Sequence, residues 1–236
     1  MNHLMPKNII HQKIASLESY LIKGDPNAPC ILLMHGYGAN FQDLLSLSTM
    51  NLPFSPSWIF PNAPLQADTT FGSSARTWLP WDQRMLENLL DPKKLKCAKE
   101  YTKGLKEIEK TLFQFINELD FSPSEIFLGG FSQGSLLATH LALSHEKMFK
   151  GLLLFSGGLF SNKKDWDCFS HKKTNLPFFQ SHGIQDPVLN YSWAQHLEKA
   201  LISSGLKGKL LSFKGGHEIP QEILISFRDF LIKHST

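Results

Sequence analysis

Short apolar runs alternate along this chain with longer stretches in which apolar residues recur every three or four positions. Short runs between turn-forming residues predict strands, and the longer period predicts amphipathic helices. The expected strands are Ile14–Tyr20, Cys30–Met34, Ser57–Phe60, Ile126–Leu128, Leu152–Phe155, Phe178–Ser181 and Lys209–Phe213. Because strands and helices alternate, the pattern predicts an α/β fold with a mainly parallel central sheet flanked by helices.

Three stripes of apolar residues at helical spacing, here called helical stripes, follow or separate these strands. They comprise Leu105, Ile108, Leu112, Phe115, Ile116 and Leu119; then Trp193, Leu197, Ala200 and Leu201; and finally Ile219, Ile223, Phe227, Phe230 and Leu231. Stripes of this kind are typical of helices that face a core. We therefore interpret them as packing surfaces and not as cofactor-binding features.

The chain has 236 residues, a length that a single α/β domain commonly reaches. No repeat, low-complexity segment or linker divides it, so we expect a tail over residues 1–12 and one domain over residues 13–236. The irregular part spans residues 61–92, where prolines stand at 61, 64, 80 and 92. This composition predicts a long loop excursion from a regular frame.

Charge and cysteine usage exclude several classes of partner. The net charge of +3 is too small to indicate a nucleic-acid partner. The basic stretch from Lys93 to Lys106 contains acidic residues, so we interpret it as a solvated helix face. Cys30, Cys97 and Cys168 are far apart and form no CxxC pair, which argues against a disulfide framework and favours a reducing compartment.

The expected location is therefore cytoplasmic. Met1–Lys13 lacks the apolar region of a signal peptide, and no run of about 18 apolar residues occurs in the chain. We expect no stable insertion into a membrane. The oligomeric state stays open.

The most informative motif is GxSxG, formed by Gly130, Phe131, Ser132, Gln133 and Gly134 between an apolar strand and a helical pattern. Glycines two positions before and after the serine allow a sharp turn that lifts the hydroxyl off the sheet edge. The motif indicates a catalytic nucleophile. The alternative is a glycine-rich connection whose serine only caps the helix.

A serine hydroxyl needs a base and an acidic group that orients the base. His217 follows the strand Lys209–Phe213 after two glycines, and Asp186 follows the strand Phe178–Ser181. Catalytic residues belong at the carboxyl ends of parallel strands. Asp165 and Asp167 lie in a polar loop with no preceding strand and are weaker candidates.

Each of these two residues also has a structural reading. His217 could be a loop histidine without a partner, and Asp186 a turn residue before a proline. His182 and Asp186 together resemble half of a metal site, but no third ligand stands at a usable spacing.

An acyl-transfer site also needs donors for the developing oxyanion. The strand Cys30–Met34 ends in His35, Gly36, Tyr37 and Gly38, and we expect the backbone N–H groups of Tyr37 and Gln133 to converge there. His35 is expected to brace this loop. The third glycine of a dinucleotide-binding GxGxxG is replaced by Phe41, so that alternative fails.

Aromatic residues in the excursion predict an acyl pocket beside this edge. Phe71, Trp78 and Trp81 offer more apolar surface than a solvated loop needs. The alternative is that they anchor the loop to the body of the domain.

Four motifs in order, LLMHGYGAN, IFPNAP, IFLGGFSQGS and HGIQDPVL with GGHEIP, resemble the phospholipase and carboxylesterase family of α/β-hydrolases, which includes acyl-protein thioesterases. The resemblance implies an α/β-hydrolase fold, no cofactor, and a catalytic triad of Ser132, Asp186 and His217. Ser135 stands where such proteins often carry a further glycine, and Leu189-Asn190 replaces their Val-Pro.

Together these inferences predict a serine hydrolase. It would cleave esters or thioesters of short- to medium-chain acyl groups through an acyl-enzyme. A lysophospholipase, a protein S-deacylase and a non-catalytic binding protein on the same fold are the alternatives.

Overall fold

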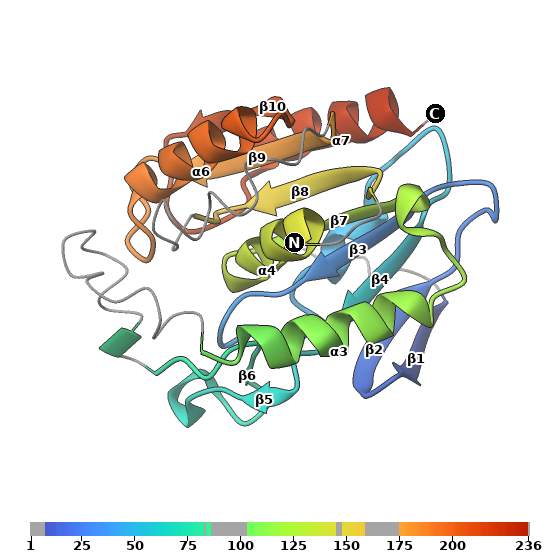
Figure 1. Cartoon of the computed structure of the whole chain (residues 1–236), viewed down its shortest axis with the longest axis horizontal. Coiled ribbons are helices and arrows are strands. Elements are labelled where there is room, and N and C mark those ends of the chain that lie inside the picture. Colours follow the sequence, from blue (N-terminus) through green and yellow to red (C-terminus); the bar gives the residue numbers. More distant parts are fainter. Residues whose placement is uncertain (1–7, 83, 86–102, 145–147, 159–174, 236) are drawn as a thin grey trace.

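An eight-stranded sheet forms the centre of the computed structural model, which describes residues 8–82, 84–85, 103–144, 148–158 and 175–235 (Figure 1). The strand order is β1-β2-β4-β3-β7-β8-β9-β10. At one edge β1 (Ile9–Ile14) and β2 (Leu17–Ile22) are antiparallel. The parallel strands are β4 (Ser57–Pro61), β3 (Cys30–Met34), β7 (Ile126–Phe131), β8 (Gly151–Phe155), β9 (Pro177–Gly183) and β10 (Lys207–Phe213). The predicted α/β class with a mainly parallel sheet is confirmed.

Helices cover both faces of the sheet, and alternate residues of each central strand pack against opposite layers. Leu32 and Leu128 belong to the core cluster beneath α3, α4 and α6, whereas Ile31 and Phe127 belong to the cluster beneath α7. Burial on both faces explains why these strands are apolar without alternation. The helices are α3 (Leu105–Asn117), α4 (Gln133–Ser144), α6 (Tyr191–Ser203) and α7 (Gln221–His234).

The three helical stripes lie on α3, α6 and α7 except for Leu119 and Ile219, which lie just outside α3 and α7. The expected strands from Cys30 onward lie within the observed ones. No helix among the described residues is both long enough and apolar enough to cross a membrane.

The N-terminal part of the sheet differs from the sequence prediction. Residues 9–12, expected in a tail, lie in β1, and the single strand expected over Ile14–Tyr20 is a hairpin. Ile14 pairs with Leu17, so only Ala15 and Ser16 form the turn. Ala15 adopts a left-handed φ of +49°, a conformation for which glycine or asparagine is the usual signal. Without that signal the reversal was not apparent in the sequence.

The excursion after β4 leaves the main sheet and forms a small sheet of its own. β5 (Leu65–Gln66) pairs with β6 (Arg76–Thr77), and the short helical turn η2 (Thr69–Phe71) lies between them. Gly38 N–H donates to Arg76 O over 2.9 Å, and Arg76 N–H donates to Ala39 O over 2.8 Å. These bonds hold the excursion against the loop that follows β3.

Several expectations concern residues outside the described part of the chain. They are the basic positions from Lys93 to Lys99, the end of the excursion, Cys97, Cys168, Asp165 and Asp167.

Replacing Ala15 by glycine is expected to stabilise the protein by about 0.5–1 kcal/mol, because glycine removes the left-handed strain at a modest cost in unfolded-state entropy. The measurement is the midpoint of urea unfolding. Ser16→Gly is the matched control, because Ser16 has no positive φ and gains nothing. An equal rise in both variants, or a fall for Ala15→Gly, would contradict the turn assignment.

Candidate active site

Ser132 occupies the sharp turn between β7 and α4. Its φ of +53° is rare for a residue with a side chain and marks local strain. Its N–H donates to Phe155 O over 2.9 Å. A Cβ at Gly134 would collide with the Met34 carbonyl, and one at Gly130 would lie 2.5 Å from the same oxygen. Both glycines of the motif are therefore required by the close approach of β3.

His217 and Asp186, predicted at the ends of β10 and β9, are joined by a hydrogen bond. His217 Nδ1 lies 2.7 Å from Asp186 Oδ2. Because an ionised carboxylate only accepts, Nδ1 carries the hydrogen and Nε2 is left as the basic nitrogen. Ile184 N–H donates to Phe213 O over 2.9 Å, and Gln185 N–H donates to Gly215 O over 3.0 Å. These bonds tie together the two loops that carry the pair.

The Asp186 carboxylate is fully buried, and four nitrogen donors lie within 3.2 Å of its oxygens. Oδ1 accepts from the N–H groups of Val188 and Leu189, each over 2.8 Å. Oδ2 faces His217 Nδ1 and, at 3.2 Å, His182 Nε2. Burial alone would raise the pKa of Asp186, but the hydrogen bonds from His182, His217 and the backbone hold that pKa well below its usual range. The side chain stays ionised at neutral pH.

Ser132 is connected to this pair through its chain neighbour Phe131. The ring of Phe131, its chain neighbour, lies 4.7 Å from the His217 ring. Within the described part of the chain, no hydrogen bond joins the Ser132 hydroxyl to His217. Hydrogen bonds of this kind are often long in ligand-free sites and tighten when substrate binds.

The loop after β3 lies next to the serine, as the oxyanion prediction requires. A Cβ on Gly36 would lie 3.3 Å from Ser132 Cβ and 3.2 Å from the Phe131 ring. Gln133 is the first residue of α4, so its N–H has no acceptor within the helix. The positive end of the α4 dipole points to the same place. The arrangement can stabilise negative charge beside Ser132.

A buried network that was not predicted from the sequence connects Gln133 with His35, in the loop that also carries Tyr37. The Gln133 side-chain Oε1 accepts from Trp78 N–H over 2.8 Å and from the Thr77 hydroxyl over 3.1 Å. Trp78 Nε1–H in turn donates to His35 O over 2.9 Å. The excursion is thereby fixed to both α4 and the Tyr37 loop.

His35 braces the loop through both ring nitrogens. Nδ1 lies 2.8 Å from Gly36 O, and Nε2 lies 3.1 Å from Ala63 N. Because a carbonyl accepts and an N–H donates, Nδ1 carries the hydrogen and Nε2 accepts. Burial lowers the pKa of His35 to about 4, so the ring is neutral at physiological pH.

Ser156, also missed from sequence, supports the loop of His217. It follows β8 with a φ of +46° and is fully buried. Its N–H donates to Ser181 O over 2.9 Å, and its hydroxyl donates to Glu218 O over 3.2 Å. A polar residue after an apolar strand was the available signal.

The three aromatic residues of the predicted acyl pocket lie in different surroundings. Trp78 is 1% exposed and Trp81 is 6% exposed, and both belong to the core. Their burial fits the anchoring alternative better than a pocket surface. Phe71 is 54% exposed, and its ring packs edge-on against Tyr37 at 5.5 Å. Of the three, Phe71 is the one whose side chain is exposed to solvent.

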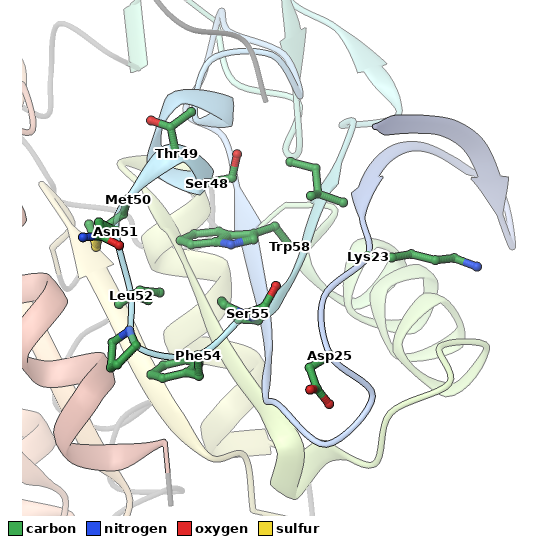
Figure 2. A pocket seen from close by; sticks show the side chains of 13 residues that line it. Lys23, Asp25, Ser48, Thr49, Met50, Asn51, Leu52, Phe54, Ser55 and Trp58 are labelled. Carbon is green, nitrogen blue, oxygen red and sulfur yellow. The ribbon is translucent and has the colours of Figure 1, made fainter. Parts of the chain in front are cut away.

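A hollow of about 690 Å³ lies at the opposite end of the sheet, where Trp58, Leu52 and Phe54 line it (Figure 2). Trp58 stands near the start of β4 and pairs with Ile22 at the end of β2. The hollow is therefore separated from the carboxyl ends of the parallel strands. Among the described residues, no group of three His, Cys, Asp or Glu side chains could hold a metal ion.

Residues 18–235 match the model of a protein family described as Phospholipase/Carboxylesterase. The acyl-protein thioesterase 1 of Kluyveromyces lactis is 30% identical over 83% of this chain and 82% of its own length. The protein of the same name from Eremothecium gossypii is 32% identical over 72% of this chain and 71% of its own.

Solved structures share the fold. The match to the esterase PE8 covers 92% of this chain and 99% of the esterase chain, with a TM-score of 0.77 and 22% identity. The match to a Bacillus cereus carboxylesterase covers 93% of this chain and 95% of the carboxylesterase chain, with a TM-score of 0.69 and 18% identity.

Replacing Gln133 by methionine is expected to lower the kcat of ester hydrolysis about tenfold while KM changes little. Methionine has a similar length, but its thioether is only a weak acceptor. Loss of the Gln133 Oε1 acceptor leaves the buried Trp78 N–H poorly satisfied, at a cost of about 1–3 kcal/mol. The excursion and the start of α4 then lose their alignment. Steady-state kinetics on a p-nitrophenyl ester give both constants. Gln195→Met, at an exposed position of α6, is the control. An unchanged kcat in folded Gln133→Met would exclude this role.

Proposed function

We propose that Ser132, His217 and Asp186 carry out the reaction of this chain, which belongs to the phospholipase/carboxylesterase family. The chain is a serine hydrolase that acts on esters or thioesters. The observation on which this proposal rests is the 2.7 Å hydrogen bond between His217 and Asp186, at the sheet edge where Ser132 occupies its strained turn. Residues of this kind, joined in this order, activate a hydroxyl as a nucleophile.

In the first half-reaction the Ser132 hydroxyl attacks the carbonyl carbon, and His217 Nε2 takes its proton. Asp186 holds His217 in the tautomer that leaves Nε2 free and stabilises the imidazolium. The N–H groups of Tyr37 and Gln133 donate to the oxyanion of the tetrahedral intermediate. His217 then protonates the departing alcohol or thiol.

In the second half-reaction a water molecule replaces the leaving group. His217 removes a proton from this water, which attacks the acyl-Ser132 carbonyl, and the same N–H groups again stabilise the oxyanion. Return of the proton to Ser132 releases the carboxylic acid. No cofactor takes part in the proposed cycle.

For the acyl part of the substrate we propose short to medium chains that lie against Phe71. An exposed phenyl ring next to Tyr37 supports this choice. Two relatives are named acyl-protein thioesterase 1, which favours a thioester of an acylated protein as one substrate. A lysophospholipid remains the alternative within the family, and a cytoplasmic location remains a prediction.

Ser132→Ala is expected to fold normally and to lose at least about 10³-fold in kcat/KM, because the other triad members act only through the nucleophile. A fluorophosphonate probe should label the wild-type protein and not this variant. Ser135→Ala, which removes a buried hydroxyl one helical turn away, is the matched control and should keep both labelling and turnover. Failure of the wild type to label or turn over would favour a binding protein.

Phe71→Ala is expected to reduce kcat/KM for octanoate esters several-fold while acetate turnover changes little. Each CH₂ that a chain buries contributes about 0.8 kcal/mol, and only the longer chain reaches the ring. The measurement is kcat/KM for p-nitrophenyl acetate, butyrate and octanoate. Ile225→Ala, at an exposed residue of α7, controls for loss of surface apolar area. An equal loss on all three esters would place Phe71 in the scaffold.

A further inference from the structure

His182 is a second histidine in contact with the Asp186 carboxylate. It lies in β9 and is 0% exposed. Nε2 is 2.9 Å from Leu189 O and 3.2 Å from Asp186 Oδ2. Because a carbonyl oxygen only accepts, Nε2 carries a hydrogen, and the Asp186 carboxylate is the second, more distant acceptor beside that nitrogen.

The other ring nitrogen of His182 has no hydrogen-bond partner among the described residues. Nδ1 is buried and makes no hydrogen bond within the described part of the chain. Leaving a buried polar atom unpaired costs about 1–3 kcal/mol. An apolar side chain of similar size would avoid this cost, so core packing alone does not account for a histidine here.

The two histidines share one oxygen. His217 Nδ1 lies at 2.7 Å and His182 Nε2 at 3.2 Å from Asp186 Oδ2. A second donor withdraws charge from an oxygen and so weakens the bond to the first. It also restricts rotation of the carboxylate, because Oδ1 is already held by two backbone N–H groups.

We propose that His182 is a positioning residue for the hydrolysis reaction, which locks the Asp186 carboxylate and moderates its attraction for the His217 proton. The proposal rests on the triad assigned above. His182 does not touch the substrate. It acts only through Asp186, by keeping His217 readily able to return its proton to the leaving group.

Two further titratable groups of the described residues stand near this cluster. The Tyr191 ring of α6 lies 6.0 Å from the His182 ring. Glu218 follows His217, but its Oε1 accepts from Gly216 N–H over 3.1 Å. Among the described residues, the ion pairs of Asp186 are those with His182 and His217.

The test compares His182→Phe with His182→Gln. Phenylalanine keeps the ring and removes the donor, whereas a glutamine amide N–H can reach the position of Nε2. In His182→Phe, the acid limb of the pH profile of kcat/KM should move to higher pH by about half a unit or more, because His217 then holds its proton more strongly. We expect kcat at the alkaline plateau to fall about threefold to tenfold with KM unchanged.

His182→Gln should restore the wild-type acid limb. If His182 only fills the core, His182→Phe would lower Tm and leave the pH profile in place, which would overturn the proposal. A similar Tm for the two variants with different pH profiles would support it.

A double-mutant cycle with Asp186→Asn separates this proposal from the triad assignment. In the Asp186→Asn background, His182→Phe should have no further effect on kcat, because its route to His217 is gone. Full additivity would overturn the positioning role. If Asp186→Asn alone retained wild-type turnover, the triad assignment itself would fail.

Discussion

The close approach of β3 to the turn after β7 is the constraint on which the site depends. Gly130 and Gly134 bring backbone against the Met34 carbonyl with no room for a Cβ. At this contact the chain reverses at Ser132, where φ is +53°, and the loop after β3 lies beside the serine. The proposed nucleophile and the loop that carries the proposed oxyanion donor Tyr37 therefore meet at the same backbone contact. A strained residue persists only where its surroundings overdetermine it.

Hydrogen bonds between neighbouring strand ends maintain this arrangement. Ser132 is bonded to β8 through Phe155 O, and Ser156 is bonded to β9 through Ser181 O. The Ser156 hydroxyl then reaches Glu218 O, next to His217. Each loop is thus braced by the next strand in the sheet, and the functional side chains are held by backbone rather than by flexible contacts. Such preorganisation is what electrostatic stabilisation of a transition state requires.

The positions of the candidate site residues were predictable from sequence because glycines and strand ends leave local signals. Ser132, Asp186 and His217 each follow a predicted strand, and parallel strands place their carboxyl ends at one edge. The hairpin at Ala15 left no such signal, since alanine rarely adopts a positive φ. Trp78 could not be placed because the polar partner of its buried indole, His35 O, lies 43 positions away in the chain. Long-range pairings of this kind arise from tertiary structure, and the periodicity of apolar residues in the sequence does not encode them.

A buried carboxylate such as Asp186 explains why polar residues collect in an otherwise apolar centre. An ionised group out of water is stable only when donors replace its hydration. His182, His217 and the N–H groups of Val188 and Leu189 supply them. Removing any one donor leaves the charge partly unpaired, so the donors must fold together with the acid. The same donors therefore stabilise the loop after β9 and orient His217. Folding of this loop and the proposed reaction thus depend on the same residues.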